Sequence, residues 1–322
     1  MSTGTSTGTS TGQPEITGVH VANVTPFRDD ADSSVDVEAY LGHVRWLAAA
    51  GVAGVIPFGT NGEGPSVAVR EKRAVLDALL AEAPAGPAGA LQVIPAVTEA
   101  NLTDALDLLR HLEDLPVTAV LVLPPYYFPA EAAGLRAFYE RVLAATRHRV
   151  IVYHIPKYAV PVPHELVTDL PVWGVKDSGG EPGYAEAVRA GGRGVLLGTE
   201  DDLPRRLLTA QGSISALANI VPEQVLALYG HVHRGEAEEA QRLSAHLQQV
   251  RAMTKEHTSA AVLKAVAQAR HGVPLGTVRP PLVPLPAGYD AAAAAARATA
   301  VPGAPAPGPA DGGGGARAGA GH

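Results

Sequence analysis

Cysteine is absent from the 322-residue sequence, and this absence removes several kinds of chemistry. Without cysteine there is no disulfide framework, no thiolate nucleophile and no zinc site with thiolate ligands. The lack of cysteine also fits a cytoplasmic protein, and we expect that location. Aromatic residues make up only 5% of the chain, so alanine, valine and leucine must fill the core that a hydrophobic content of 46% allows.

Three further absences narrow the class of protein. The formal net charge is −7, and no basic stripe is present to bind phosphates, so we expect no nucleic-acid partner. No run of eighteen apolar residues occurs, so we expect no membrane-spanning helix. The opening MSTGTSTGTSTGQPE has neither the basic nor the apolar region of a signal peptide.

The two ends of the chain differ in composition from its middle. Residues 1–14 are a Ser/Thr/Gly repeat, which predicts a disordered tail. Residues 286–322 form a second low-complexity tail, rich in Ala, Pro and Gly, in which the Ala run could be briefly helical. The functional argument therefore depends on residues 15–285.

This middle part alternates between short apolar runs and amphipathic stretches, which predict strands and helices. Eight strands are expected at 19–24, 54–58, 91–96, 119–123, 150–153, 172–176, 194–197 and 213–216. The expected helices between them span 35–49, 66–80, 101–112, 131–145, 164–169, 182–190 and 202–210, with Ser33-Ser34 and Ser66 as caps of the first two.

Eight such alternations predict an α/β fold, a (β/α)₈ TIM barrel over residues 15–221. A doubly wound open sheet is the alternative, but it would need a glycine-rich phosphate turn after its first strand, and GxGxxG is absent there. Further helical segments at 222–229, 235–253 and 259–270 exceed what a barrel requires. They predict a C-terminal helical extension over residues 222–285.

A lysine ends the sixth predicted strand, in PVWGVKDSGG at 171–180. Lys176 is either a side chain that reaches solvent from a strand end, or an amine placed to attack a carbonyl. The active site of such a barrel lies at the carboxyl ends of the strands, which favours the second interpretation. Tyr153 ends the adjacent strand and could exchange protons with the amine. Taken alone, it could equally be a core aromatic.

The second strand ends in GTNGEG at 59–64. Small residues such as Gly59 let backbone N–H groups turn outward to hold a carboxylate or phosphate, and Thr60 and Asn61 add a hydroxyl and an amide. A simple tight turn is the alternative. His154 and His164 do not form a metal-ligand cluster, and we expect both to be structural and the protein to hold no metal.

Together these segments resemble the dihydrodipicolinate synthase / N-acetylneuraminate lyase superfamily of pyruvate-dependent class I aldolases. The resemblance spans about Gly18 to Leu285. The matching segments are VTPF at 24–27, GTNGE at 59–63, PYY at 125–127, YHIP at 153–156, GVKD at 174–177, GTED at 198–201, GSIS at 212–215 with Asn219 and Pro222, and RPPL at 279–282.

The resemblance implies a role for each site residue. Lys176 matches the lysine that forms an imine with pyruvate, so no other cofactor is implied. Tyr153 matches the tyrosine that relays protons, and Tyr127 one that completes the relay, often across a dimer interface. Thr60 and Asn61, with Gly59 beside them, match the loop that holds the pyruvate carboxylate, and Ile214 matches a position lining that pocket. A homo-oligomer, a dimer or tetramer, is implied.

Two departures bear on the substrate. Dihydrodipicolinate synthases usually carry a second threonine where Asn61 stands, and an arginine where Tyr158 stands, with Lys157 before it. Without that arginine the chain is more similar to aldolases of 4-hydroxy-2-oxo acids and 2-oxo-3-deoxy sugar acids, which join or release pyruvate and an aldehyde. The alternatives are a dihydrodipicolinate synthase acting on aspartate semialdehyde, a sugar-acid dehydratase using the same imine, and a non-catalytic member that binds 2-oxo acids.

Overall fold

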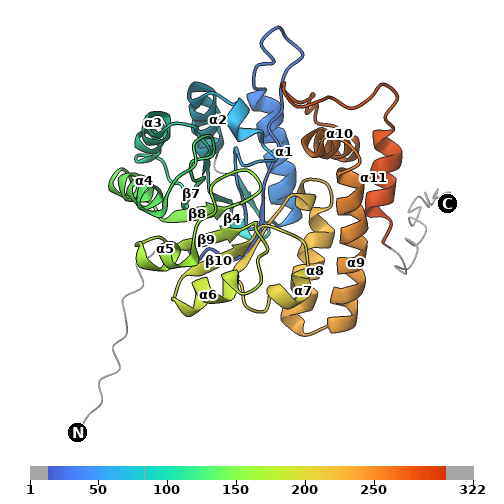
Figure 1. Cartoon of the computed structure of the whole chain (residues 1–322). Helices are drawn as coiled ribbons and strands as arrows, with labels where there is room; N and C mark the ends of the chain where they lie inside the picture. The colour runs from blue at the N-terminus through green and yellow to red at the C-terminus, as the bar shows by residue number, and fades with distance from the viewer. Residues whose placement is uncertain (1–13, 83, 302–322) are drawn as a thin grey trace, which may run out of the picture.

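The computed structural model describes residues 14–82 and 84–301, and its centre is a parallel sheet (Figure 1). The strands follow the eight predicted runs closely. They are β1 (Gly18–Val21), β2 (Gly54–Val55), β5 (Gln92–Val93), β6 (Ala96–Val97), β7 (Val120–Val122), β8 (Val150–His154), β9 (Gly174–Asp177), β10 (Gly194–Leu197) and β11 (Gly212–Ser215).

The sheet closes on itself through its third segment. The strand order is β5-β2-β1-β11-β10-β9-β8-β7-β6, and its two ends, β5 and β6, are halves of one segment interrupted at Ile94 and Pro95. The Ile94 N–H donates to Val55 O at 3.0 Å on one side, and the Leu121 N–H donates to Pro95 O at 2.9 Å on the other. The predicted (β/α)₈ barrel is therefore confirmed.

Both faces of the barrel wall are buried, because successive strand residues point to opposite sides. One buried cluster, which includes Ile151, Tyr153 and Ile214, fills the interior. Alternate residues such as Val152 and Val175 belong to the larger cluster under the helices. At the start of β9 the strands approach so closely that a Cβ on Gly174 would lie 1.9 Å from Gly194 O, so only glycine fits there.

Helices surround the sheet in the predicted order (Figure 1). They are α1 (Val37–Ala50), α2 (Val69–Glu82), α3 (Leu102–Leu112), α4 (Ala132–Ala144), α5 (His164–Asp169), α6 (Tyr184–Ala190), α7 (Leu203–Arg206) and α8 (Pro222–Arg234). Short 3₁₀ helices η1 (Gly64–Ser66) and η2 (Leu217–Asn219) follow β2 and β11, and a small antiparallel hairpin joins β3 (Ala85–Gly86) to β4 (Gly89–Ala90).

Two predicted helix caps are wrong. Asp36, not Ser33 or Ser34, caps α1 by accepting the Ala39 N–H at 3.1 Å. The two serines belong to a turn closed by the Arg28 N–H bond to Ser34 O at 2.8 Å, which keeps them out of the helix. Ser66 ends η1 instead of capping α2, and its carbonyl accepts a hydrogen bond from Arg279 Nη1 at 2.7 Å.

The three helical segments predicted for the C-terminal extension over residues 222–285 are present (Figure 1). The first is α8, and the others are α9 (Ala237–Thr254), which packs on α8, and α10 (Ser259–His271). The Ala run forms a further helix, α11 (Ala291–Thr299), which packs on α9 and α10 and buries Ala294, Ala295 and Ala298. Residues 1–13 and 302–322, which make up most of the two predicted tails, lie outside the described residues. Within the described part of the chain, no helix has both the length and the apolar character to cross a bilayer.

Candidate active site

Lys176 and Tyr153 face each other inside the carboxyl end of the barrel. They are paired neighbours on β9 and β8, and both side chains point to the interior, since Val175 and Val152 point outward. Lys176 is only 3% exposed, and its Nζ lies 4.2 Å from the centroid of the Tyr153 ring. The structure thus brings together the amine and the phenol that the sequence predicts.

The loop after β2 joins this pair through Thr60. The hydroxyls of Thr60 and Tyr153 lie 3.0 Å apart, so the phenol is hydrogen-bonded on the side of the glycine-rich loop. Thr60 is exposed, Asn61 is half-buried and Gly59 is buried. A hydroxyl, a phenol and a buried amine in this order can bind a small carbonyl compound and move protons at it.

Glu63 holds the same loop in place through hydrogen bonds to residues late in the chain. It is 3% exposed, has a left-handed backbone with φ of 53°, and accepts hydrogen bonds from Lys264 Nζ at 2.5 Å and the Arg279 N–H at 2.9 Å. Burial lowers the pKa of Lys264 to about 8, despite the adjacent Glu63 carboxylate. The loop that carries Thr60 is therefore held by the helical extension, since Lys264 lies on α10.

Asn219 holds the neighbouring end of β1. Its Oδ1 accepts the Val24 N–H at 3.1 Å and lies 3.0 Å from His43 Nε2, while its Nδ2 donates to Ala22 O at 2.9 Å. Burial lowers the pKa of His43 to about 4, so the ring is neutral and donates from Nε2 to the amide oxygen. Thr25 completes this support by donating to Gly62 O at 2.7 Å.

Two buried carboxylates hold the ends of β9 and β10. Asp177 pairs with Arg206 at 2.6 Å and accepts the N–H groups of Gly179 and Gly180 at 3.0 and 3.2 Å. Glu200 accepts from the Ser215 hydroxyl at 3.3 Å and lies 3.4 Å from Arg251 Nε on α9. Burial raises the pKa of Glu200.

The other predicted residues occupy different surroundings. Ile214 is buried in the barrel interior beside β1, where it can line a pocket around Lys176. Tyr127 is 78% exposed, and its ring meets that of Phe128 edge to face, with centroids 5.0 Å apart. Within the described chain no hydrogen bond joins Tyr127 to Tyr153 or Thr60. A relay through Tyr127 therefore stays a prediction.

The two histidines occupy packing positions. His154 stacks on Tyr184 with centroids 4.1 Å apart, and its Nδ1 accepts the Val162 N–H at 3.3 Å. Burial lowers the pKa of His154, which favours the neutral ring that this acceptor role requires. His164 meets the edge of the same Tyr184 ring at 6.3 Å.

The comparison with known families decides the identity of this arrangement. The model of the dihydrodipicolinate synthetase family matches residues 15–298, nearly all of the described chain. The chain belongs to this family. The superfamily that its motifs predict is therefore confirmed.

Relatives within the family are similar over most of their length. The chain is 32% identical over 284 residues to an uncharacterized DapA-like lyase of Chloroflexus aurantiacus, covering 84% of this chain and 92% of the relative. It is 28% identical over 279 residues to the 4-hydroxy-tetrahydrodipicolinate synthase of Methanosarcina barkeri, covering 83% and 92%. The wild-type sialic acid aldolase of Ruminococcus gnavus superposes with a TM-score of 0.81 at 25% identity, covering 88% of this chain and 96% of the aldolase.

These family relatives bear the names of a lyase, a synthase and an aldolase, so the family is one of enzymes that act on small molecules. At the position where the synthase pattern has an arginine, this member has Tyr158, which is 52% exposed. Lys157 Nζ lies 4.9 Å from the centroid of the Tyr158 ring. The pair forms an open aromatic and cationic surface rather than a guanidinium fork.

Sequence reasoning did not find the supporting partners of the site. Lys264 meets Glu63 across 201 positions, and Arg251 meets Glu200 across about fifty. Both lysine and arginine lie on amphipathic helices, where a charged residue ordinarily faces solvent. The one available signal was the glutamate inside a glycine-rich turn, since a buried carboxylate needs a cationic partner.

Proposed function

We propose that the chain is a Schiff-base-forming lyase that makes or breaks a carbon–carbon bond between pyruvate and an aldehyde. The observation that supports this most directly is the buried Lys176 amine beside Tyr153, whose hydroxyl is tied to Thr60 at 3.0 Å. A buried amine next to a proton carrier suits attack on a keto carbon. The sialic acid aldolase of Ruminococcus gnavus, a similar fold, is also described with its catalytic lysine mutated, which agrees with a lysine mechanism.

In the cleavage direction, the Lys176 amine adds to the C2 carbonyl of a 4-hydroxy-2-oxo acid, and the carbinolamine loses water to give an imine. The protonated imine then accepts the electrons of the C3–C4 bond as the C4 hydroxyl loses its proton, and an aldehyde leaves. The remaining enamine takes a proton at C3, and water releases pyruvate from the lysine. Tyr153 carries these protons, while the loop of Gly59, Thr60 and Asn61 holds the carboxylate.

Borohydride trapping tests the imine. Incubation with pyruvate and borohydride, followed by peptide mass mapping, should give a reduced adduct on Lys176 that is lost in Lys176→Ala. Lys157→Ala is the matched control, because Lys157 is an exposed lysine at the end of the adjacent strand. An adduct on another lysine, or none at all, would remove the proposed mechanism.

Tyr153→Phe separates proton transfer from imine formation. The variant keeps the ring beside Lys176 but loses the hydroxyl that meets Thr60. We expect trapping to remain detectable while the cleavage rate falls by about 10²–10⁴-fold, the usual contribution of a positioned acid or base. Equal rates in the two proteins would exclude the phenol as the proton carrier.

For the second substrate, we propose an aldehyde such as glyoxylate or glyceraldehyde, or a larger sugar-derived one. Tyr158 offers no bidentate grip for a second carboxylate, in contrast to an arginine. Synthesis from pyruvate and aspartate semialdehyde is the second candidate, favoured by the synthase relatives. Product analysis with each aldehyde distinguishes the two, and dehydration of a sugar acid would be seen as a product that keeps its full carbon chain.

We also infer a homo-oligomer. Tyr127 and Phe128 are both more than 70% exposed and contact each other edge to face, and aromatic residues gathered at one surface are typical of interfaces. Analytical sedimentation of the full chain and of the variant Tyr127→Ser/Phe128→Ser measures the oligomeric state of each. A monomer at micromolar concentration would contradict the inference.

A further inference from the structure

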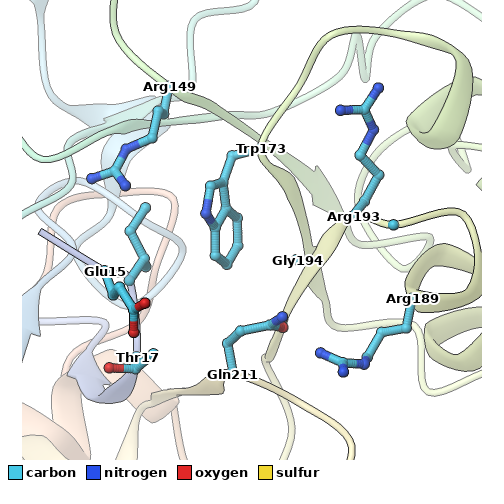
Figure 2. Close-up of a pocket in the computed structure, with 10 residues that line it drawn as sticks. Glu15, Thr17, Arg149, Trp173, Arg189, Arg193, Gly194 and Gln211 are labelled. Carbon is cyan, nitrogen blue, oxygen red and sulfur yellow. The ribbon is translucent and has the colours of Figure 1, made fainter. Parts of the chain in front are cut away.

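Figure 2 shows a cavity of about 620 Å³. It lies at the amino end of the barrel, whereas Lys176 and Tyr153 lie toward the carboxyl ends of their strands. Its lining residues immediately precede β1, β8, β9, β10 and β11 or end α6. They are Glu15, Ile16, Thr17, Arg149, Trp173, Arg189, Gly192, Arg193, Gly194 and Gln211. A cavity of this volume is in the usual range for small-molecule sites.

Three arginines line this cavity, and none has an acidic partner among the residues that the structure describes. Arg149 donates only to Thr118 O, at 3.3 Å from Nε and 3.0 Å from Nη2, and Arg193 donates to Thr168 O at 3.1 Å. The Arg193 Nε is buried and has no hydrogen-bond partner. In residues 14–82 and 84–301, no ion pair includes Arg149, Arg189 or Arg193.

The charge of this lining opposes that of the whole chain. Three arginines against one carboxylate, Glu15, leave the lining with a formal charge of +2, whereas the chain carries −7. Burial lowers the pKa of Arg149, a sign that the charged guanidinium lacks full solvation. Unpaired guanidinium groups in a concave surface attract anions, and they match phosphate and carboxylate oxygens in particular.

Trp173 and Gln211 shape the rest of the cavity. The indole packs closely on Gly194, where a Cβ would lie 2.5 Å from the ring, so only glycine leaves room for the indole there. In Figure 2 Arg149 lies on one side of the indole and both Arg193 and Arg189 lie on the other, with the Arg189 side chain extending toward Gln211. Gln211 Oε1 accepts the Val195 N–H at 2.7 Å, which leaves the amide N–H groups of Gln211 as donors.

We propose that this cavity binds a phosphate monoester that carries a planar group, a site distinct from the one around Lys176. The phosphate, a dianion, matches the +2 lining and takes its hydrogen bonds from Arg189, Gln211 and the neighbouring arginines. The planar group stacks on the indole of Trp173, because aromatic rings favour offset-stacked contacts and can also interact with nearby guanidinium groups.

Adenosine monophosphate is the probe for this proposal, with inorganic phosphate and succinate as comparisons, titrated into the full chain by calorimetry. We expect the monophosphate to bind more tightly than either, and Arg189→Ala to weaken it about tenfold, the effect of one charge-assisted contact. The matched control is Arg141→Ala, an exposed arginine in the last turn of α4 that does not line the cavity. Both variants should keep the unfolding temperature of the wild type.

Tryptophan fluorescence adds a local readout. The chain has two tryptophans, so Trp46→Phe leaves Trp173 as the sole reporter, and its emission should change as the monophosphate binds. Absence of binding at millimolar monophosphate, or equal weakening by Arg141→Ala, would overturn the site. Succinate binding as tightly as the monophosphate would overturn the assignment to phosphate, and equal binding of inorganic phosphate would overturn the role of the indole.

Discussion

The two halves of the barrel mouth that holds the candidate site are built differently. On the side of β1 and β2, the loop of Thr60 is clamped by Glu63, Lys264, Thr25 and Asn219, all of them buried. On the side of β7 and β8, the segments 124–130 and 155–163 contain no ion pair within the described chain, and they expose Tyr127, Phe128 and Tyr158. We call these the clamped half and the open half.

This difference agrees with the two substrates of the proposed reaction. A carboxylate and a keto group of constant shape suit a rigid pocket, because rigidity keeps the reacting atoms aligned without further ordering cost. A second substrate of variable length suits an open surface, because such a surface places few limits on the length of the substrate. Substitutions in the clamped half should therefore change stability, and those in the open half should change selectivity.

Lys176→Ala is expected to have the largest effect on activity, because Lys176 lies where the halves meet. Loss of the nucleophile should lower kcat by about 10⁴-fold or more. The free energy of unfolding should change far less than in a clamp variant, since Lys176 forms no ion pair with any residue that the structure describes. Steady-state kinetics and urea unfolding measure the two effects. A strong loss of stability would place Lys176 in the clamp instead.

Lys264→Ala should have the largest effect on stability. It leaves Glu63 as a buried carboxylate without its cation, and breaking such a pair costs about 3–5 kcal/mol. The control is Arg45→Ala, which breaks two exposed pairs, with Glu82 at 2.7 Å and with Glu38 at 2.8 Å, and should cost about 1 kcal/mol. Urea unfolding of both variants compares them.

The double variant Glu63→Gln/Lys264→Met sharpens this test. It removes both charges and so should recover part of the loss seen in Lys264→Ala, because no unpaired buried charge remains. If Lys264→Ala lowers the free energy of unfolding no more than Arg45→Ala does, the pair of Glu63 and Lys264 does not stabilise the loop. The clamped half would then be no more rigidly held than the open half.

Acid should weaken the clamped half through His43. Its pKa falls from 6.5 to about 4 on folding, so the unfolded chain binds more protons than the folded one between these values. This contribution to stability is fully present above pH 6.5 and is lost as the pH falls toward 4. The difference corresponds to about 3 kcal/mol, at about 1.36 kcal/mol for each pKa unit.

The variant His43→Gln keeps a donor for Asn219 but does not titrate near neutral pH. Its free energy of unfolding should therefore depend less on pH between 7 and 4.5 than that of the wild type, as measured by urea unfolding at each pH. His271, with a pKa also lowered to about 4, remains in the variant and accounts for part of the residual slope. Identical slopes in the two proteins would contradict the role of His43.

The sequence predicts the strands and the pair of Lys176 and Tyr153 better than it predicts the buried residues that hold the surrounding loops. Apolar runs that end in Tyr153 and Lys176 locate both residues, because strand ends of one barrel meet at one mouth. The glycine-rich turn after the second strand indicates Thr60, and the resemblance to a family then adds Ile214. Glu63 with Lys264 cannot be found in this way, since nothing local relates a loop glutamate to a helix lysine 201 positions later.

The interruption of the third strand illustrates a second limit. The run at 91–96 predicts one strand, and the structure divides it into β5 and β6 around Ile94 and Pro95. Pro95 has no N–H to donate, which weakens a ladder at that residue, yet its carbonyl still accepts the Leu121 N–H. The cap of α1 is a similar case. Ser33 and Ser34 are typical cap residues, but the hydrogen bond from the Arg28 N–H to Ser34 O holds them in a turn, and the local sequence does not reveal this pairing.

Tyr158→Arg is expected to have the smallest effect on stability and tests the open half directly. Because the Tyr158 side chain is 52% exposed, replacing it should change the free energy of unfolding by about 0.5 kcal/mol or less. The new guanidinium can bind a second carboxylate through two hydrogen bonds, so kcat/KM for aspartate semialdehyde relative to glyceraldehyde should rise about tenfold.

The control for this prediction is Lys157→Ala, at the neighbouring position. It removes a less directional positive charge and should lower the same ratio only slightly. Competition assays with both aldehydes measure the ratio. An unchanged ratio in Tyr158→Arg would mean that the second substrate binds elsewhere, and a large loss of stability would mean that the open half is as tightly built as the clamped one.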